Sequence, residues 1–335
     1  MKKKIKLTVW MITISLLIAA VLFVLQQHSF SMTEQKIEID TPQGQLTGTL
    51  VLPESYSGTV GLVVFVHGDG PVNDTYDDGY KPLWEKLASA GYASLSLNKP
   101  GIGGSSGNWL EQSMEDRAQE TIYAINWAKS LPMINTQAIG LWGASQAGWV
   151  IPKIVKKVPD LAFSILVSPA IQWISQGQYN TRQEMILEGF SEQEIQKRED
   201  YNAQILLLLK EQASYESYLR IAQSDDLISK EKWGFFAKNY QSDASKDLKN
   251  FTTPVHLVLG GQDINVDVEE TERVYREKIP ENLLSVFYIP DADHSMLSKK
   301  NASSPLRTYL TAVFFPRHIV VEQYLDDLVH FVSQF

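Results

Sequence analysis

Short apolar segments that end in glycine or proline alternate with longer segments of helical character along most of the chain. Residues 61–71 (GLVVFVHGDGP), 92–107 (YASLSLNKPGIGGSSG) and 161–169 (LAFSILVSP) each begin with a largely apolar run of strand length. Runs of this kind are typical of strands that are buried on both faces, as in a parallel sheet. Helices are predicted between them, near 81–90 and 113–129, so the pattern indicates an α/β fold with helices on both faces of a mainly parallel central sheet.

The same pattern extends toward both ends of the chain. Residues 36–40 and 45–53 alternate apolar and polar side chains on either side of PQG, which predicts a hairpin at the beginning of the sheet. Strand-like segments return at 254–263 and 283–294, and a helix is predicted between them near 268–278. A last helix is predicted close to the C-terminus.

Residues 171–250 interrupt this alternation. The block is charged, helical in pattern and rich in aromatic residues, and it has no strand signal. Insertions between the strands of a parallel sheet commonly lie at the carboxyl ends of the strands, where ligands bind. We therefore expect a helical cap insertion over a site, and a purely structural helical layer is the alternative.

The N-terminus has the pattern of a membrane anchor. Residues 1–6 (MKKKIK) carry four lysines, and the 19 residues at 7–25 carry no charge. About 20 apolar residues cross a bilayer, and flanking lysines keep their own end in the cytoplasm. The sequence predicts a cytoplasmic stretch at 1–6, a transmembrane signal-anchor helix at 7–25, a tether at 26–35 and an extracytoplasmic domain at 36–335, in a single-pass protein of the cell membrane.

A cleaved signal peptide, and hence a secreted protein, is the alternative for this segment. The apolar region of a signal peptide is usually shorter, about 7–15 residues, and it precedes a cleavage site of small residues. The residues after Leu25, QQHSFSMTEQ, contain no convincing site of that kind. The sequence therefore favours the uncleaved anchor.

Charge and cysteine content exclude several classes of function. The chain has a formal charge of −9, and without its four N-terminal lysines 26 basic residues stand against 39 acidic ones. An acidic body repels nucleic acid, so we expect no nucleic-acid partner. Cysteine is absent, which rules out thiol catalysis and cysteine-based zinc sites. His28, His256, His318 and His330 follow no metal-ligand spacing, and we expect no metal and no organic cofactor.

A lone serine, Ser145, lies among small residues where a predicted strand changes into a predicted helix, in GLWGASQAGW (140–149). On a sharp strand-to-helix turn, a serine hydroxyl is exposed at the edge of the sheet beside the free N–H groups of the helix N-terminus. Small residues two positions before and after the serine let the two backbones pass closely, and Gly143 and Ala147 meet that need. An ordinary turn or a close helix contact is the alternative.

Residues 143–147 (GASQA) resemble the G-x-S-x-G motif of the α/β-hydrolase family, with alanine in place of the last glycine. The resemblance extends from about residue 36 to the C-terminus in the order of elements. It is to the esterase, thioesterase and serine-peptidase-like branches with a helical cap. It implies an α/β-hydrolase fold whose cap is the insertion at 171–250.

The family has its catalytic residues in the order serine, acid and histidine, and this sequence offers a candidate for each. Asp263 follows a strand-like segment and two glycines, and His294 follows the next such segment. The resemblance implies Ser145 as the nucleophile, His294 as the base and Asp263 as the acid that orients the imidazole. Asp267 is the alternative acid.

The segment HGDGP (67–71) supplies the last part of the expected site. By the resemblance, the backbone N–H groups of Asp69 and Gln146 form the oxyanion hole, which binds the negatively charged oxygen of the reacting group. We expect His67 to brace this loop through hydrogen bonds. GIGGSSG (101–107) lacks the G-K-[ST] of a phosphate-binding loop, and we interpret it as another loop at the rim of the pocket.

Together these features predict a serine hydrolase that cleaves carboxylic esters of a small-molecule acyl substrate through an acyl-enzyme on Ser145. A peptidase, a thioesterase or an acyltransferase on the same site is the alternative, and a non-catalytic receptor or scaffold is a further one. The length of the acyl chain and the oligomeric state do not follow from the sequence.

Overall fold

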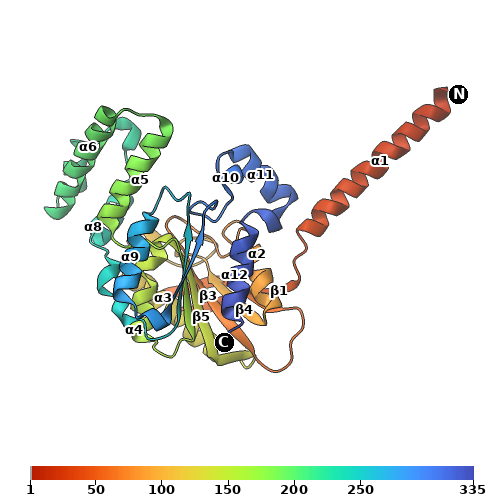
Figure 1. The fold of residues 1–335 in the computed structure, drawn as a ribbon, viewed down its shortest axis with the longest axis horizontal. Coiled ribbons are helices and arrows are strands. Elements are labelled where there is room, and N and C mark those ends of the chain that lie inside the picture. Colours follow the sequence, from red (N-terminus) through yellow and green to blue (C-terminus); the bar gives the residue numbers. More distant parts are fainter. Residues whose placement is uncertain (1) are drawn as a thin grey trace.

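One mixed sheet of eight strands forms the centre of the protein (Figure 1). The computed structural model describes residues 2–335. The strands are β1 (Met32–Thr41), β2 (Gly44–Pro53), β3 (Val60–Val66), β4 (Tyr92–Leu97), β5 (Ile134–Ala144), β6 (Phe163–Val167), β7 (Val255–Gly260) and β8 (Leu284–Ile289). Their spatial order is β1-β2-β4-β3-β5-β6-β7-β8.

The sheet is parallel except at the edge formed by its first two strands, β1 and β2. β1 and β2 form an antiparallel hairpin, and β2 pairs antiparallel with β4. The other neighbours, from β4 through β3 to β8, are all parallel pairs. The predicted hairpin and the mainly parallel sheet are confirmed. Because the parallel strands share one direction, the residues that follow β3, β5, β7 and β8 meet at the same edge of the sheet.

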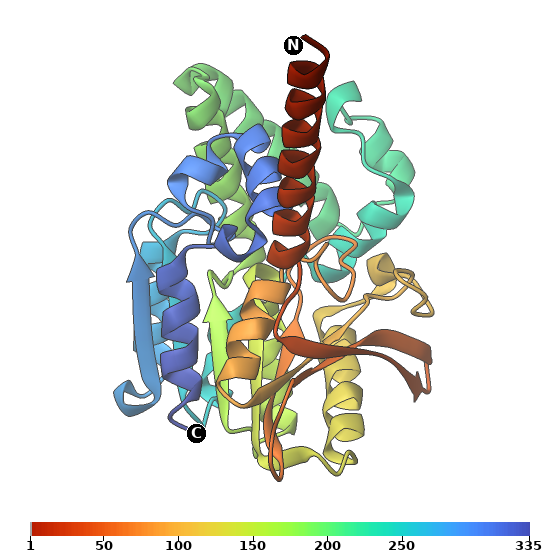
Figure 2. The same cartoon turned by 90° about the vertical axis from the view of Figure 1, so that its right-hand side faces the viewer.

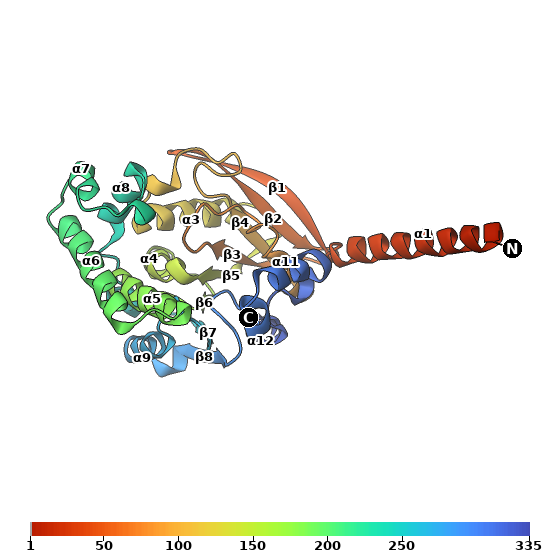
Figure 3. The same cartoon turned by 90° about the horizontal axis from the view of Figure 1, so that it is seen from above.

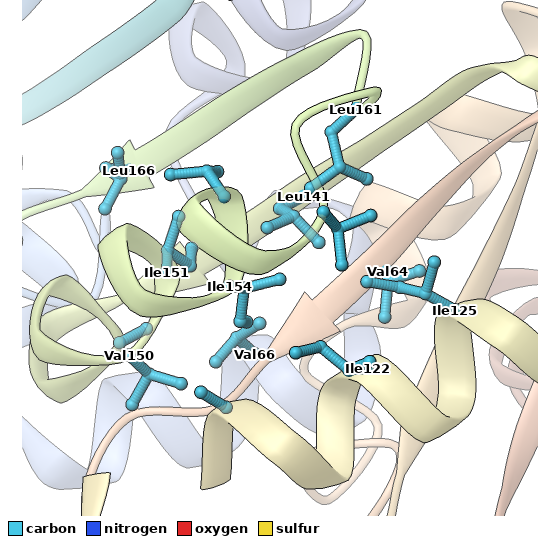
Figure 4. Close-up of a cluster of buried hydrophobic side chains, with 14 of the residues drawn as sticks. Val64, Val66, Ile122, Ile125, Leu141, Val150, Ile151, Ile154, Leu161 and Leu166 are labelled. Atoms are coloured by element: carbon cyan, nitrogen blue, oxygen red, sulfur yellow. The ribbon is translucent and has the colours of Figure 1, made fainter. Parts of the chain in front are cut away.

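Helices cover both faces of the sheet. One face carries α3 (Met114–Lys129), α4 (Ile151–Lys157) and α9 (Val268–Lys278), and the other carries α2 (Lys81–Ser89) and α12 (Glu322–Val332). On the first face, Ile125 of α3 and Ile154 of α4 are fully buried against Val64 and Leu141 of the strands (Figure 4). Burying one such side chain contributes about 1.5–3 kcal/mol, so these contacts hold α4, and with it the turn that precedes α4, firmly against the sheet.

The chain between β6 and β7 is helical, as expected for residues 171–250. It contains α5 (Trp173–Glu188), α6 (Glu192–Lys210), α7 (Tyr215–Leu219) and α8 (Lys230–Asn239). Figure 2 shows these helices beyond the arrowheads of the parallel strands. Leu209, Tyr218, Trp233 and Tyr240 form a small apolar core within the insertion. The insertion thus has its own packing and lies at the carboxyl edge of the sheet.

The N-terminal helix α1 (Lys2–Gln27) projects away from the rest of the protein, at the end opposite the insertion (Figure 3). Its segment Trp10–Gln27 is long and apolar enough to cross a membrane, and none of that segment is buried inside the protein. The helix ends at Gln27 and β1 begins at Met32, so the connection is shorter than the tether expected at 26–35. Residues 32–35, expected to be part of the tether, belong to β1 and pair with β2, since the register of the hairpin begins at Met32 and Pro53.

Two helices between β8 and α12 did not appear in the sequence-based prediction. These are α10 (Lys299–Ala302) and α11 (Pro305–Phe314), followed by the 3₁₀ helix η7 (Pro316–His318). They lie beyond the carboxyl edge of the sheet, beside the end of α1 (Figure 2). α11 has no buried residue, so it does not belong to the core of the domain.

Candidate active site

Ser145 lies on a strained turn at the end of β5. Its φ of 54° is in the left-handed region, which costs a non-glycine residue on the order of 1–3 kcal/mol. The chain passes there directly into the 3₁₀ helix η2 (Ser145–Trp149) and then into α4. The Ser145 carbonyl accepts a hydrogen bond from the N–H of Ala170 at 3.0 Å, which helps to hold the turn. The strand-to-helix turn expected from the sequence is therefore present, with its first helical turn in the 3₁₀ form.

The small residues around Ser145 fit one another sterically. A Cβ atom on Gly143 would lie 2.6 Å from the Cβ of Ala147 and 2.7 Å from Cδ1 of Ile151, which is closer than real Cβ contacts come. Gly143 therefore makes room for Ala147, which is fully buried. Ala147 stands where the G-x-S-x-G motif has its last glycine. It is tolerated because Gly143, the first glycine of the motif, has no side chain and leaves space for the methyl group of Ala147.

Asp263 and His294 are in direct contact. The Oδ2 atom of Asp263 lies 2.8 Å from Nδ1 of His294. The carboxylate is fully buried and its Oδ1 accepts the N–H groups of Asn265 and Val266 at 2.8 and 2.9 Å. These bonds fix the orientation of the carboxylate. Since a carboxylate accepts, Nδ1 of His294 carries the proton and Nε2 is left as the basic nitrogen.

The three residues of the expected triad follow parallel strands and lie at one edge of the sheet, after β5, β7 and β8. Two of them are joined by the bond just described. Among the described residues, no hydrogen bond connects the Ser145 hydroxyl to His294. Such bonds are often long or absent in unliganded hydrolases and form when substrate is bound. The structure thus joins His294 to Asp263 and places Ser145 at the same edge.

The other aspartates near this edge have different partners. Asp267, the alternative acid, caps the N-terminus of α9 by accepting the N–H groups of Glu269 and Glu270. Asp293 accepts the N–H groups of Ser295 and Leu297 within its own loop. Asp263 is therefore the carboxylate that holds the imidazole of His294.

A second serine, histidine and aspartate are in contact at the opposite edge of the sheet. His256 lies between the Ser285 hydroxyl at 2.7 Å and the Asp327 carboxylate at 2.6 Å. His256 and Ser285 are the second residues of β7 and β8, and Asp327 is on α12. Ser285 lies on a regular strand without the strained turn of Ser145. This cluster joins α12 to the sheet, and it offers a control for experiments on Ser145.

The loop after β3 approaches Ser145 from the side. A Cβ atom on Gly68 would lie 3.5 Å from the Cβ of Ser145. The backbone N–H groups of Asp69 and Gln146, the two expected oxyanion donors, have no hydrogen-bond partner among residues 2–335. The side-chain amide of Gln146 also donates to Oδ1 of Asp69 at 3.0 Å, which ties the two residues together.

Two buried cations hold this loop from behind, and sequence reasoning missed both. Lys99 donates to the carbonyls of Gly68 at 2.6 Å and Gly70 at 2.8 Å. Arg117 of α3 donates to the carbonyl of His67 and to the side-chain oxygen of Gln146. Burial, and next the charge of Arg117, hold the pKa of Lys99 well below its ordinary value. The N–H and C=O of a trans peptide point in opposite directions. Because Lys99 and Arg117 bind the carbonyls of the loop, the N–H groups of those peptides point away from the two side chains.

The helical insertion contacts the same loop through Lys232 of α8. The Lys232 ammonium group lies 3.6 Å from Oδ2 of Asp69 and 5.2 Å from the centre of the Trp109 ring. Burial opposes ionisation of Asp69, but Lys232 and then Lys99 outweigh it and hold its pKa below the ordinary value. This contact links the cap to the residue that carries an expected oxyanion donor.

His67 braces the loop, as expected. Its Nε2 lies 2.5 Å from the carbonyl of Leu97, and its Nδ1 lies 3.0 Å from the Tyr80 hydroxyl. A carbonyl only accepts, so Nε2 carries the proton and Nδ1 of the neutral ring accepts from Tyr80. Both ring nitrogens are engaged, and the ring is buried.

Acid is expected to destabilise the fold through His67. Burial lowers its pKa to about 3, whereas a histidine in an unfolded chain titrates near 6.5. Between these values the unfolded state binds a proton that the folded state does not. The free energy of unfolding therefore falls as the pH falls through this window, by up to about 1.4 kcal/mol per pH unit.

Denaturant unfolding of the full chain in detergent, between about pH 7 and pH 5, measures this effect. His67→Gln is the comparison, because its amide can still donate to the Leu97 carbonyl but does not titrate. The wild type is expected to show the steeper pH dependence. Equal slopes in the two proteins would contradict the assignment of a buried, neutral His67.

No group of three or more histidine, aspartate or glutamate side chains suited to holding a metal ion occurs in the part of the chain that the structure describes. The arrangement at the carboxyl edge instead has the elements of acyl transfer. It presents a strained serine, an imidazole oriented by a buried carboxylate, and two unpaired backbone N–H groups near the serine.

The fold is shared with several solved structures. The Pyrococcus furiosus esterase Pf2001 is 18% identical, with 91% of this chain and 92% of that chain covered and a TM-score of 0.59. Est1E from Butyrivibrio proteoclasticus is 15% identical, with 90% and 96% covered and a TM-score of 0.53. The α/β hydrolase GrgF from Penicillium sp. sh18 is 17% identical, with 90% and 100% covered and a TM-score of 0.55. At these identities the likeness concerns the fold. No curated protein matches the chain in sequence.

The sheet order, the strained turn at Ser145 and the family model together define an α/β hydrolase, as the resemblance in the sequence implied. The family model described as serine aminopeptidase, S33, matches residues 58–301, and the chain belongs to this family. The matched segment contains Ser145, Asp263 and His294.

Proposed function

We propose that this protein is a serine hydrolase that cleaves carboxylic esters through an acyl-enzyme on Ser145, with His294 as the base and Asp263 as its orienting acid. The observation that carries the proposal is the bond of 2.8 Å between His294 and a fully buried Asp263, at the edge of the sheet where Ser145 occupies its strained turn. Membership of a hydrolase family supports it.

Acylation begins when Nε2 of His294 removes the proton from the Ser145 hydroxyl. The serine oxygen bonds to the ester carbonyl carbon, and the carbonyl oxygen becomes an anion that the N–H groups of Asp69 and Gln146 bind. One such donor is typically worth about 3 kcal/mol of transition-state stabilisation. The C–O bond to the leaving group then breaks, and the imidazolium returns its proton to the departing alkoxide, which leaves as an alcohol.

Deacylation repeats these steps with water. His294 removes a proton from a water molecule, and the resulting hydroxide bonds to the acyl carbon. The bond to the serine oxygen breaks, that oxygen regains the proton from His294, and the free acid departs. Asp263 stabilises the imidazolium in both halves, and no metal or organic cofactor takes part in these steps.

The family itself favours one alternative. Its model is named for serine aminopeptidases, which makes an amide of an N-terminal residue the second candidate substrate. The same triad serves both reactions, because each passes through an acyl-serine and differs in the leaving group.

A substrate panel separates the two. The full chain in detergent is assayed with p-nitrophenyl esters of graded acyl length and with aminoacyl p-nitroanilides. We expect kcat/KM for the best ester to exceed that for every anilide by at least about tenfold. A reversed ratio would assign a peptidase. Absence of turnover on both, together with no labelling by a fluorophosphonate, would indicate a non-catalytic protein.

We further propose that α1 is an uncleaved signal anchor. Its exposed apolar surface and the lysines at 2–4 and 6 support a helix whose N-terminal end stays in the cytoplasm, with the hydrolase domain on the other side of the cell membrane. A secreted protein that has lost this segment is the alternative. N-terminal sequencing of the protein from membranes and from medium separates them.

A further inference from the structure

The helix α11 presents an apolar face that no part of residues 2–335 buries. Leu306, Tyr309, Leu310 and Phe314 follow helical spacing and therefore share one side of the helix. Their side chains, and that of the adjacent Phe315, are between 40% and 67% exposed. Exposed apolar residues that cluster in this way mark an interaction surface.

The position of this face is set by contacts with the end of α1. The rings of Phe23 and Phe315 meet edge to face at 5.7 Å, and His28 donates from Nε2 to the carbonyl of Val313 at 2.8 Å. Figures 1 and 2 both show α11 beside the last turns of α1. The contacts therefore place α11 level with residues 23–28 of the N-terminal helix.

Arg317 fixes the end of α1 to the domain. Its guanidinium donates to the carbonyls of Gln27 and Ser29 at 2.7 Å each, and to both carboxylate oxygens of Glu85 on α2 at 2.7 and 2.8 Å. A cation at the C-terminal end of a helix is also favoured by the helix dipole. Arg317 therefore links the C-terminal end of α1 to Glu85 of the domain, and this link fixes the direction in which α1 leaves the domain.

The charge of this segment differs from that of the rest of the chain. Residues 295–318 contain Lys299, Lys300, Arg307 and Arg317 and no aspartate or glutamate, in a chain whose formal charge is −9. Lys299, Lys300 and Arg307 are exposed. Basic residues beside an apolar helical face that carries aromatic side chains are typical of helices that lie in the interface of an anionic membrane.

We propose that the apolar face of α11 is a membrane-docking surface, seated in the headgroup region of the bilayer that α1 spans. The inference rests on the membrane insertion of α1 proposed above. The span of α1 ends at Gln27, and α11 is held level with that end, where the acyl chains give way to headgroups. The apolar surfaces of α1 and α11 are then one continuous lipid contact.

This docking bears on the candidate active site. Only residues 295–298 separate His294 from α10, and Met296 in this connection is buried in the domain. A bilayer that holds α10 and α11 therefore also holds the loop of the proposed base, and it keeps the carboxyl edge of the sheet close to the membrane surface.

The test measures how deeply single positions enter the bilayer. The chain has no cysteine, so Leu310→Cys, Leu17→Cys in α1 and Leu187→Cys in α5 can each be labelled with an environment-sensitive fluorophore. The full-length variants are reconstituted in vesicles of equal parts phosphatidylcholine and phosphatidylglycerol. Lipids that carry a nitroxide at a shallow or a deep position on the acyl chain are then added as quenchers. Tyr309→Cys serves as a second reporter on the same face.

We expect the label at 310 to lose at least about half of its fluorescence to the shallow quencher, and the label at 17 to respond to the deep quencher. The label at 187, an apolar position on the cap that is 73% exposed, is expected to respond to neither. If the labels at 310 and 309 are quenched no more than the label at 187, while the label at 17 is quenched, α1 spans the bilayer and the docking proposal is wrong. Loss of quenching at 17 overturns it as well. If the labelled protein shows no quenching at 310 and the unlabelled Leu310→Cys variant forms disulfide-linked dimers, the face belongs to a contact with a second copy of the chain.

Discussion

Ser145→Ala is expected to lower kcat for ester hydrolysis by about a million-fold while the protein stays folded. The substitution removes the oxygen that forms the acyl-enzyme, and loss of a triad nucleophile has an effect of this size in serine hydrolases. Alanine differs from serine by one atom, so the strained turn at φ 54° and its bond to Ala170 are retained. The residual rate would come from substrate binding and the oxyanion donors.

The control for this variant is Ser285→Ala. Ser285 also bonds to a histidine that contacts an aspartate, but it lies on a regular strand at the opposite edge of the sheet. Turnover of p-nitrophenyl esters and labelling by a fluorophosphonate are measured for both variants, with thermal unfolding as the check on folding. Full activity of Ser145→Ala, or loss of activity only in Ser285→Ala, would refute the assignment of the nucleophile.

The central strands were predictable because they are buried on both faces. Strands β3 and β6 are almost wholly buried, so the sequence shows them as continuous apolar runs bounded by turn residues. The first strand is different. β1 is largely exposed, and its residues 32–35 have mixed polarity, so the pattern did not distinguish the end of a tether from the beginning of a strand.

The helices α10 and α11 were missed for a related reason. Prediction of a helix relied on apolar residues that face a core, and α11 faces none. Local signals were nevertheless present. Ser304 caps the helix, Pro305 occupies its first turn, and the apolar residues recur at helical spacing. A helix that has a good N-terminal cap and an apolar face but no core to cover is itself evidence of a partner outside the domain.

The site was predictable in part because its reactive side chains follow strand ends. Asp263 and His294 come a few residues after β7 and β8, and parallel strands bring such positions to one edge. Lys99 and Arg117 could not be found in this way. Buried charges are rare, and the groups they bind are mostly backbone carbonyls, which have no signature in the sequence.

Asp263→Asn is expected to lower kcat by about 10⁴-fold with little change in KM. The Oδ1 atom of asparagine can still accept the N–H groups of Asn265 and Val266, so the loop should keep its shape. The amide nitrogen, however, would donate to Nδ1 of His294. The imidazole would then carry its proton on Nε2, where it cannot accept the proton of Ser145. Steady-state kinetics with the best ester, together with thermal unfolding, measure the effect.

Asp267→Asn is the matched control, because it makes the same change of charge four residues along the chain. Asp267 caps α9, and asparagine caps a helix about as well as aspartate does. Its kcat should therefore stay within about twofold of the wild type. Both variants lose one negative charge, so a difference in kcat between them cannot come from the total charge of the protein. The difference in kcat therefore reports the tautomer of His294. Equal losses in both variants, or a loss confined to Asp267→Asn, would contradict the role assigned to Asp263.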